Sequence, residues 1–335
     1  MQGIKICIFG AGAIGGYLAH GLAGVEGVDL SIIARGPHLA AIREKGLKLI
    51  RDGGETTVAV KASADPHDLG PQDYVIVALK AHQAWESAGL LAPLLSPQTA
   101  VVTCQNGVPW WYFHKLQGPY EGRRLTSVDA GDHQWHRLGP ERAIGCVVYP
   151  AAEIAEPGVI RHVFGDKFTL GEPDGSASER TSRLSAAIEA GGLQAPVVDD
   201  IRSEIWLKLW GNVCFNPISA LTRATLDVVA SDPGTRALAR AMMIEAREIG
   251  TRLGASFRVD VERRIDGAAR IGAHRTSMLQ DLEAGRALEI DALVTAVQEM
   301  GRITGVPTPF IDAVLALVQQ LGQSQGLYAG PPSPA

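Results

Sequence analysis

The chain has 335 residues, of which 46% are hydrophobic and 20% are charged, and its net charge is −5. This length exceeds what one hydrophobic core usually organises, so we expect two domains. The acidic balance and the lack of a Lys/Arg-rich run argue against nucleic acid as a partner. No stretch approaches the roughly 20 apolar residues that span a bilayer, and no signal peptide precedes the first strand. We therefore expect a cytoplasmic protein without a membrane partner.

Short β-branched runs alternate with helix-like segments in the first half of the chain, which is typical of a doubly wound parallel sheet. The fold class is therefore α/β. Residues 47–61 fit either a hairpin or an extra strand pair. Strands are expected at residues 5–9, 30–34, 74–79 and 100–103, and crossover helices at residues 12–23 and 82–94.

A glycine-rich loop follows the first strand directly and opens a helical segment, which is the context that a dinucleotide-binding loop requires. The first glycine permits a tight turn, the second lets a pyrophosphate approach the backbone, and the third allows close packing of helix on strand. The alternative, that these glycines only end a strand, ranks lower because of their spacing. The candidate cofactor-binding residues are Gly10, Ala11, Gly12, Ala13, Ile14 and Gly15.

Arg35 ends the second predicted strand, about 20 residues past the last glycine, where an acidic residue would bind the ribose hydroxyl of NAD. A guanidinium can instead pair with a 2′-phosphate through two hydrogen bonds. Asp29 precedes that strand rather than following it. Arg35 therefore favours NADP, although a solvated turn arginine remains the alternative.

An aromatic-rich segment, residues 108–141, follows the strand at 100–103. Roughly two dozen of its residues, around 118–141, are more than a compact α/β unit needs. The segment could form a lid or wall of a ligand pocket, or its aromatic side chains could serve ordinary packing or a dimer surface. His133 and His136 lack further ligands at metal spacing, so no metal site is expected. Four separated cysteines are predicted to be buried free thiols: Cys7, Cys104, Cys146 and Cys214.

The second half begins with strand-like runs that we expect to extend the sheet in antiparallel fashion, and then becomes helical throughout. The predicted domains are residues 1–198 and a helical domain of residues 199–330, followed by a proline-rich tail, 331–335, that we expect to be disordered. The predicted strands are 143–149, 158–164 and 167–170, and the predicted helices are 200–219, 233–253, 277–282, 289–304 and 309–321.

One predicted helix carries a polar stripe within an apolar body. Lys208, Asn212 and Asn216 recur every fourth residue and therefore share one face. Buried charges and amides need partners, so internal pairing is one interpretation and a ligand site is the other. Three polar side chains in a row favour the ligand site. Pro217 is expected to turn Asn216 away from helical geometry.

The motifs together resemble those of the ketopantoate reductase (2-dehydropantoate 2-reductase) family. The resemblance implies an N-terminal Rossmann domain, a C-terminal all-helical domain, and NADPH/NADP+ as cofactor. It rests on residues 10–15, Leu79-Lys80-Ala81, Gln105-Asn106-Gly107, Glu204 through Lys208, Asn212 through Pro217, Ser277 through Asp281, and Glu289-Ile290-Asp291.

The resemblance also implies roles for single residues. Lys208 would be the general acid, with Glu289 in contact with the substrate or with this lysine. Lys80 and Asn106 would lie near the cofactor, and both follow strands at the carboxyl edge of the sheet, where open α/β folds bind ligands. Taken alone, Lys80 also fits a surface loop, and Ser277 and Glu289 fit helix starts. The implied substrate-binding residues are Asn106, Asn212, Asn216, Ser277 and Glu289.

The leading hypothesis is an oxidoreductase acting on a CH–OH group that reduces 2-dehydropantoate to pantoate with NADPH, a reaction of pantothenate biosynthesis. The first alternative is an NADPH-dependent reductase of another, bulkier 2-oxo acid. A second alternative, from a different class, is a non-catalytic protein that senses NADP(H). The expected partner is a small 2-oxo acid, and a homodimer is left open.

Overall fold

The computed structural model describes residues 3–330, which form two compact units. The first unit comprises residues up to 105 together with 114–116 and 133–201, and the second comprises 106–113, 117–132 and the chain from 202 onward. Much of the aromatic-rich segment therefore belongs to the second unit. The predicted boundary at residue 198 would place all of this segment in the first domain. The tail expected at 331–335 lies outside the described residues.

The first unit contains a seven-stranded sheet in the order β11-β8-β7-β6-β1-β2-β5. Its neighbours pair in parallel except β11, which is antiparallel to β8. The predicted α/β class is confirmed, and β1 lies at the point where the strand order reverses. The bounds are β1 Ile4–Phe9, β2 Val28–Ile33, β5 Lys61–Ser63, β6 Tyr74–Val77, β7 Ala100–Thr103, β8 Ala143–Val148 and β11 Phe168–Gly171.

A second, four-stranded sheet has the order β4-β3-β10-β9. Its strands β3 Leu47–Arg51 and β4 Gly54–Val58 form the hairpin alternative, and β10 Val159–Phe164 pairs with β3 in parallel and with β9 Ala151–Glu156 in antiparallel. The expectation that the run at 158–164 extends the main sheet is therefore wrong. Its buried residues pack on α1 Ala13–Leu22: a Cβ on Gly16 would lie 2.7 Å from Ile160.

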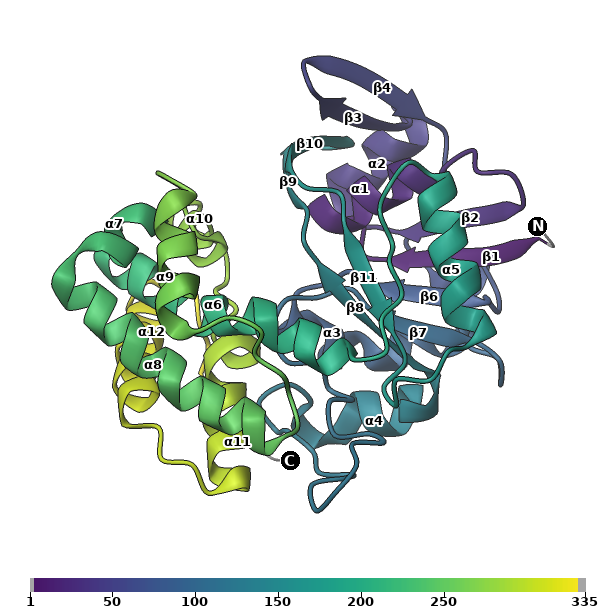
Figure 1. Ribbon diagram of the computed structural model, residues 1–335. Coiled ribbons are helices and arrows are strands. Elements are labelled where there is room, and N and C mark those ends of the chain that lie inside the picture. The colour runs from purple at the N-terminus through teal and green to yellow at the C-terminus, as the bar shows by residue number, and fades with distance from the viewer. Residues whose placement is uncertain (1–2, 331–335) are drawn as a thin grey trace. The chain divides into compact units, whose positions relative to one another are not determined.

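Helix α1 contacts strands of both sheets, and Figure 1 shows it beside β9 and β10. The helix predicted at 12–23 is thus confirmed. The helix expected at 82–94 divides into α3 and a 3-10 helix, η2, that contains Pro93. Further elements of this unit are α2 Gly36–Lys45, η1 Pro66–Asp68, α3 Ala81–Ser87, η2 Ala88–Leu94, α4 His133–Leu138, η4 Pro140–Arg142 and α5 Glu179–Ala190.

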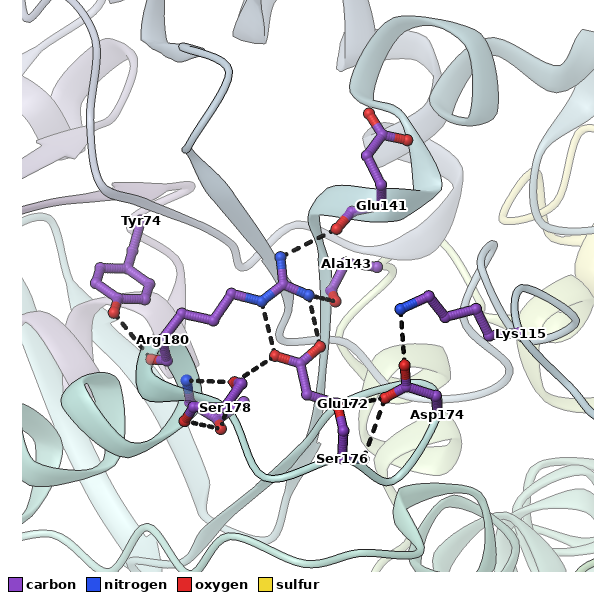
Figure 2. A network of polar contacts seen from close by, with 10 residues as sticks. Tyr74, Lys115, Glu141, Ala143, Glu172, Asp174, Ser176, Ser178 and Arg180 are labelled. Atoms are coloured by element: carbon purple, nitrogen blue, oxygen red, sulfur yellow. Dashed lines mark hydrogen bonds and ion pairs between the residues drawn. The ribbon is translucent and has the colours of Figure 1, made fainter.

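An ion pair between the half-buried Arg180 and the buried Glu172 stabilises the antiparallel edge of the main sheet (Figure 2). The guanidinium of Arg180, in the first turn of α5, donates two hydrogen bonds of 2.7 and 2.5 Å to the carboxylate of Glu172. It also donates to the backbone carbonyls of Glu141 and Ala143 at 3.0 and 3.1 Å. Because Glu172 follows β11 and Ala143 begins β8, this arginine ties the two antiparallel strands together at one end of the pair.

Lys115 pairs with Asp174 at 2.7 Å in the same region (Figure 2). Hydrogen bonds from Lys115 and then Ser176 hold the pKa of Asp174 well below its ordinary value of 3.8. A carboxyl group whose pKa is lowered by folding stabilises the protein at pH values above its ordinary pKa. This stabilisation is lost as the pH falls through the folded-state pKa.

Lys115→Met should therefore lower the free energy of unfolding by about 0.2–1 kcal/mol near neutral pH, the range of solvent-exposed pairs. The difference from wild type should shrink progressively as the medium is acidified below the ordinary carboxyl pKa. Urea unfolding across a pH series measures it, with Lys61→Met as the control at an exposed lysine. A difference that grows on acidification would contradict this assignment.

The second unit is helical, as predicted, and also holds the irregular residues 106–113 and 117–132 with the short 3-10 helix η3 Ala130–Asp132. Helices α7 and α9 were not predicted. Within residues 3–330, none of the helices combines the length and apolar character that a membrane crossing requires. The bounds are α6 Ile201–Thr222, α7 Leu226–Ser231, α8 Pro233–Arg252, α9 Val261–Arg270, α10 Ser277–Glu283, the π-helix η5 Asp291–Thr295, α11 Ala296–Thr304 and α12 Pro309–Ser324.

Helix α6 is the core element of this unit. Trp206 and Trp210 are fully buried and pack edge-on against Phe257, and the Trp210 indole N–H donates to the Met243 carbonyl of α8 at 2.7 Å. The helix continues through Pro217, so the expectation that Asn216 departs from helical geometry is wrong. Buried side chains on both sides of the proline hold the flanking turns in place despite the missing N–H.

Part of the aromatic-rich segment, residues 108–141, packs into the core of the protein. Four consecutive residues, 110–113, are buried. The hydroxyl of Tyr112 accepts from the Trp206 indole at 2.6 Å, and its carbonyl accepts from the Arg202 guanidinium at 2.8 Å. The carboxylate of Glu299 accepts from the backbone of Thr126 and Ser127 at 2.9 and 3.0 Å. These contacts anchor the segment on the helices of the second unit.

All four cysteines are free and buried, as predicted. Burial raises the pKa of Cys7 and of Cys214 to about 12. Thiols with such pKa values carry almost no thiolate near neutral pH, so neither is a nucleophile. Across residues 3–330, no group of three or more His, Cys, Asp or Glu side chains is arranged to hold a metal ion.

Candidate active site

The glycine loop lies between β1 and the first turn of α1. Gly10 has a φ of +107°, which an L side chain rarely adopts. The backbone N–H groups of Gly10 and Ala11 donate to the carbonyl of Ile33, the last residue of β2, at 3.1 and 3.2 Å. The loop is therefore fixed to the carboxyl end of the neighbouring parallel strand.

The three glycines of the loop differ in what surrounds them. A Cβ on Gly10 would lie 2.6 Å from the Leu79 side chain, and one on Gly15 would lie 2.0 Å from the Gly10 carbonyl oxygen. A Cβ on Gly12 would meet no described atom within 4 Å. Gly10 and Gly15 are thus required by packing, whereas Gly12 leaves open space beside the backbone, as a pyrophosphate needs.

This contrast makes a testable pair of variants. Gly15→Ala should lower the free energy of unfolding by about 1–3 kcal/mol, because the added methyl group collides with the Gly10 carbonyl oxygen. Gly12→Ala should unfold at nearly the wild-type temperature but bind NADPH at least about 10-fold more weakly, because the methyl group fills the space nearest the phosphates. Calorimetry and titration of cofactor fluorescence measure the two effects. Wild-type NADPH affinity in Gly12→Ala would remove this residue from the cofactor site.

The N-terminus of α1 is arranged to receive an anion. Gly12 is its N-cap, so no side chain caps the first turn, and that turn contains no acidic residue. The first N–H groups of a helix have no partner within the helix, and the helix dipole favours negative charge at this end. The loop and helix therefore fit the phosphates of a dinucleotide.

Arg35 lies two residues after the end of β2 and is the N-cap residue of α2. It is exposed, and no acidic side chain among residues 3–330 forms an ion pair with it. Asp29 lies near the opposite end of the same strand. The guanidinium thus lies at the strand end that adjoins the glycine loop, where a ribose 2′-phosphate would meet a cation and no carboxylate.

His38 is a residue of this site that the sequence did not indicate. Its Nδ1 accepts from the backbone N–H of Gly158 at 3.0 Å, while its buried Nε2 has no hydrogen-bond partner within the described chain. Burial lowers the pKa of His38, and the backbone of Ala11 acts in the opposite direction. A neutral imidazole therefore lies beside the glycine loop. Only the pairing of β10 with β3 brings Gly158 to α2.

Two loops at the carboxyl edge of the sheet are tied together. Lys80 is the N-cap residue of α3 and follows β6, while Gln105 follows the neighbouring strand β7. The Gln105 carboxamide donates to the Leu79 carbonyl at 2.7 Å, so it holds the turn that carries Lys80. This role of Gln105 was not predicted.

The second unit brings together two predicted substrate-side residues from distant parts of the sequence. The Lys208 ammonium, on α6, donates to the Asn106 side-chain carbonyl at 2.6 Å. Both residues are half-buried, which makes a charge-assisted hydrogen bond stronger than it would be in water. The ammonium is therefore held in a defined position.

Further along the same face of α6, the Asn216 amide donates to the Ser277 hydroxyl at 3.2 Å. Asn216 is buried, and Ser277 is the first residue of α10, whose N-cap is Thr276. Asn212 lies on α6 between Lys208 and Asn216 and is half-buried. The stripe therefore continues as a row of hydrogen-bonding groups. Glu289 is also half-buried and lies just before η5.

Both halves of the chain match models of one known protein family. Residues 6–175 match the family described as ketopantoate reductase PanE/ApbA, and residues 200–322 match its C-terminal counterpart. A 2-dehydropantoate 2-reductase from Mesorhizobium japonicum is 60% identical over 97% of this chain and 100% of its own length.

Solved structures of the same family have a similar fold. A protein from Ralstonia solanacearum MolK2 assigned as a ketopantoate reductase is 44% identical, with a TM-score of 0.92 over 97% of this chain and 99% of its own. A PanE/ApbA family ketopantoate reductase from Ralstonia eutropha JMP134 is 27% identical, with a TM-score of 0.82 over 96% of this chain and 100% of its own. The chain therefore belongs to the ketopantoate reductase family, whose members are NADPH-dependent oxidoreductases that act on a CH–OH group.

Proposed function

We propose that the protein reduces 2-dehydropantoate (ketopantoate) to pantoate with NADPH and that Lys208 is the general acid. The observation that carries the proposal is the hydrogen bond from the Lys208 ammonium to the Asn106 amide oxygen. Lys208 lies on the same face of α6 as Asn212 and Asn216. The 60% identical relative named for this activity supports the choice of substrate.

Lys208 supplies both charge and a proton in this reaction. The bound nicotinamide provides the hydride that is added to C2 of the 2-oxo acid. The C2 carbonyl oxygen then gains negative charge and takes a proton from the Lys208 ammonium, which solvent later reprotonates. Pairing with Asn106 uses one of the three ammonium donors and fixes the direction of the others.

The other polar residues of the second unit are assigned to substrate orientation. Asn212, Asn216 and Ser277 present amide and hydroxyl groups that suit the carboxylate and hydroxyl groups of ketopantoate, and Glu289 is proposed to contact the substrate or Lys208. Such residues raise the rate by holding the carbonyl in a reactive geometry. Their direct test is the change in KM for the keto acid when each is replaced by alanine.

The cofactor is proposed to bind through the first unit. Residues 10–15 would hold the pyrophosphate, Arg35 the 2′-phosphate, and Lys80, together with Asn106, the region near the nicotinamide. The open space beside Gly12 and the uncapped N-terminus of α1 are the features that support this assignment.

Loss of NADPH absorbance with a panel of 2-oxo acids of increasing side-chain size tests the proposed function. We expect the highest kcat/KM with ketopantoate. A higher value with a bulkier 2-oxo acid would favour the alternative substrate class. Tight NADPH binding without turnover of any acid would favour a sensor and contradict the proposed reaction.

A further inference from the structure

The contact between Asn106 and Lys208 depends on the residue that follows Asn106. Gly107 has a φ of +91°, and a Cβ at this position would lie 2.3 Å from the carbonyl oxygen of Ala292. The next residue, Val108, donates its backbone N–H to that same oxygen at 2.9 Å. The chain on the carboxyl side of Asn106 therefore lies directly against the backbone at Ala292, and only glycine permits this approach.

Ala292 belongs to η5, one turn of π-helix directly before α11. Regular α-helix resumes at Ala296. Such π-helical turns are rare, and they occur frequently at functional sites. The widened turn places the Ala292 carbonyl where Val108 can reach it, so it determines where residues 106–108 lie in the second unit.

A second set of contacts fixes the π-helical turn itself. The carboxylate of Asp291 accepts from the Tyr328 hydroxyl at 2.7 Å and from the Thr295 hydroxyl at 2.8 Å. Just before the turn, the Leu288 backbone N–H donates to the Leu327 carbonyl at 3.0 Å. Burial raises the pKa of Asp291, while the hydrogen bonds from Tyr328 and Thr295 oppose that shift. The chain near its C-terminus thus clamps both sides of Glu289 and Ile290.

We propose that η5 and Tyr328 form a positioning element that holds Asn106 in register with the Lys208 ammonium. Asn106, Gly107 and Val108 are consecutive, so a shift of the backbone at Gly107 moves the Asn106 amide by a similar amount. Hydrogen bonds weaken steeply as their geometry departs from the ideal, and small misplacements of catalytic groups lower rates strongly. This inference rests on the proposed role of Lys208.

Gly107→Ala and Gly118→Ala form a matched pair of variants that tests the positioning role. Gly118 belongs to the same unit and has a φ of +108°, but a Cβ there would meet no described atom within 4 Å. Both variants therefore carry the same backbone strain, and only Gly107→Ala pushes against Ala292. We expect kcat to fall by at least about 10-fold in Gly107→Ala alone, with a far smaller change in the dissociation constant for NADPH, whose phosphates would be held by residues 10–15.

Tyr328→Phe provides a second test that does not depend on the folding of Gly107→Ala. It removes the hydroxyl that donates to Asp291 and accepts from the Gln319 amide, and Tyr120→Phe is the control at a tyrosine whose hydroxyl makes no hydrogen bond within residues 3–330. We expect kcat to fall by about 3- to 10-fold in Tyr328→Phe, because the hydrogen bond that holds Asp291 is lost together with the weaker one from Gln319, with a far smaller change in NADPH affinity. Tyr120→Phe should retain the wild-type kcat.

A purely structural role for the clamp predicts a different pattern. Thermal midpoints would fall, while kcat of the folded protein in Tyr328→Phe and in any folded Gly107→Ala would stay at the wild-type value; that result overturns the inference. Failure of the proposed function is a separate observation, because it requires that Lys208→Met itself retain turnover.

Discussion

Lys208→Met should lower kcat for ketopantoate reduction by about 10²- to 10⁴-fold, the range attributed to one general acid. Methionine keeps most of the side-chain length and apolar surface but carries no proton donor. The developing alkoxide would then be left without the cation that the Asn106 amide holds in position. Stopped-flow measurement of NADPH oxidation in a single turnover reports the chemical step directly.

Two controls separate this effect from damage to the fold or to the cofactor site. Titration of cofactor fluorescence should give the wild-type dissociation constant, because the phosphate-binding loop belongs to the other unit. Asn106→Ala should produce a smaller loss of kcat, since the ammonium remains but is less well oriented. Turnover of Lys208→Met within a factor of about 3 of wild type would assign the proton to another group.

Arg35→Asp should raise the KM for NADPH by about 100-fold and change the KM for NADH far less. The guanidinium can make two charge-assisted hydrogen bonds to a 2′-phosphate, whereas a carboxylate would repel it. NADH has a hydroxyl at that place, which a carboxylate can accept from. Steady-state kinetics with both cofactors at saturating keto acid measure the change in preference.

Lys45→Asp is the matched control for this charge reversal. Lys45 is the last residue of α2, the helix that Arg35 caps, and it is exposed. Each variant replaces a positive charge by a negative one, so a general electrostatic effect would raise the KM for NADPH in both. Equal increases for NADPH and NADH in Arg35→Asp would contradict the proposed contact with the 2′-phosphate.

The elements around the glycine loop were predictable because their signals are local. A strand, a glycine loop and a helix lie within residues 4–22, and Arg35 falls at the end of the next strand. The spacing of the glycines indicates the steric functions of Gly10 and Gly15 and the open space beside Gly12. Helix α2 was missed because Gly36 and Pro37 at its start are typical of a turn, although proline is also favoured in a first helical turn.

The second sheet could not be predicted in full because its pairing is non-local. The hairpin of β3 and β4 is visible as a local pattern, but β10 pairs with β3 across more than a hundred intervening residues. The alternation of apolar and polar residues along a strand indicates which side chains are buried, but it does not indicate which strand pairs with it. His38 acquires its hydrogen bond from Gly158 through this pairing, so that contact had no signal in the sequence.

The stripe on α6 was predicted from its four-residue spacing, since helical periodicity fixes which side chains share a face. Pro217 misled the prediction because local preference is weaker than the packing of a buried helix. The clamp on η5 had no such signal. Asp291 and Tyr328 are far apart in the sequence, and the contact of Gly107 with Ala292 is made by backbone atoms that carry no residue-specific pattern.

Transfer of deuterium from NADPH labelled at the reactive C4 position tests the central claim most directly. The protein is incubated with labelled NADPH and ketopantoate, and the product is analysed by mass spectrometry and NMR. We predict pantoate that carries one deuterium at C2, formed in proportion to the NADP+ produced. Oxidation of the cofactor without deuterated pantoate, or no reaction at all, would contradict the assignment.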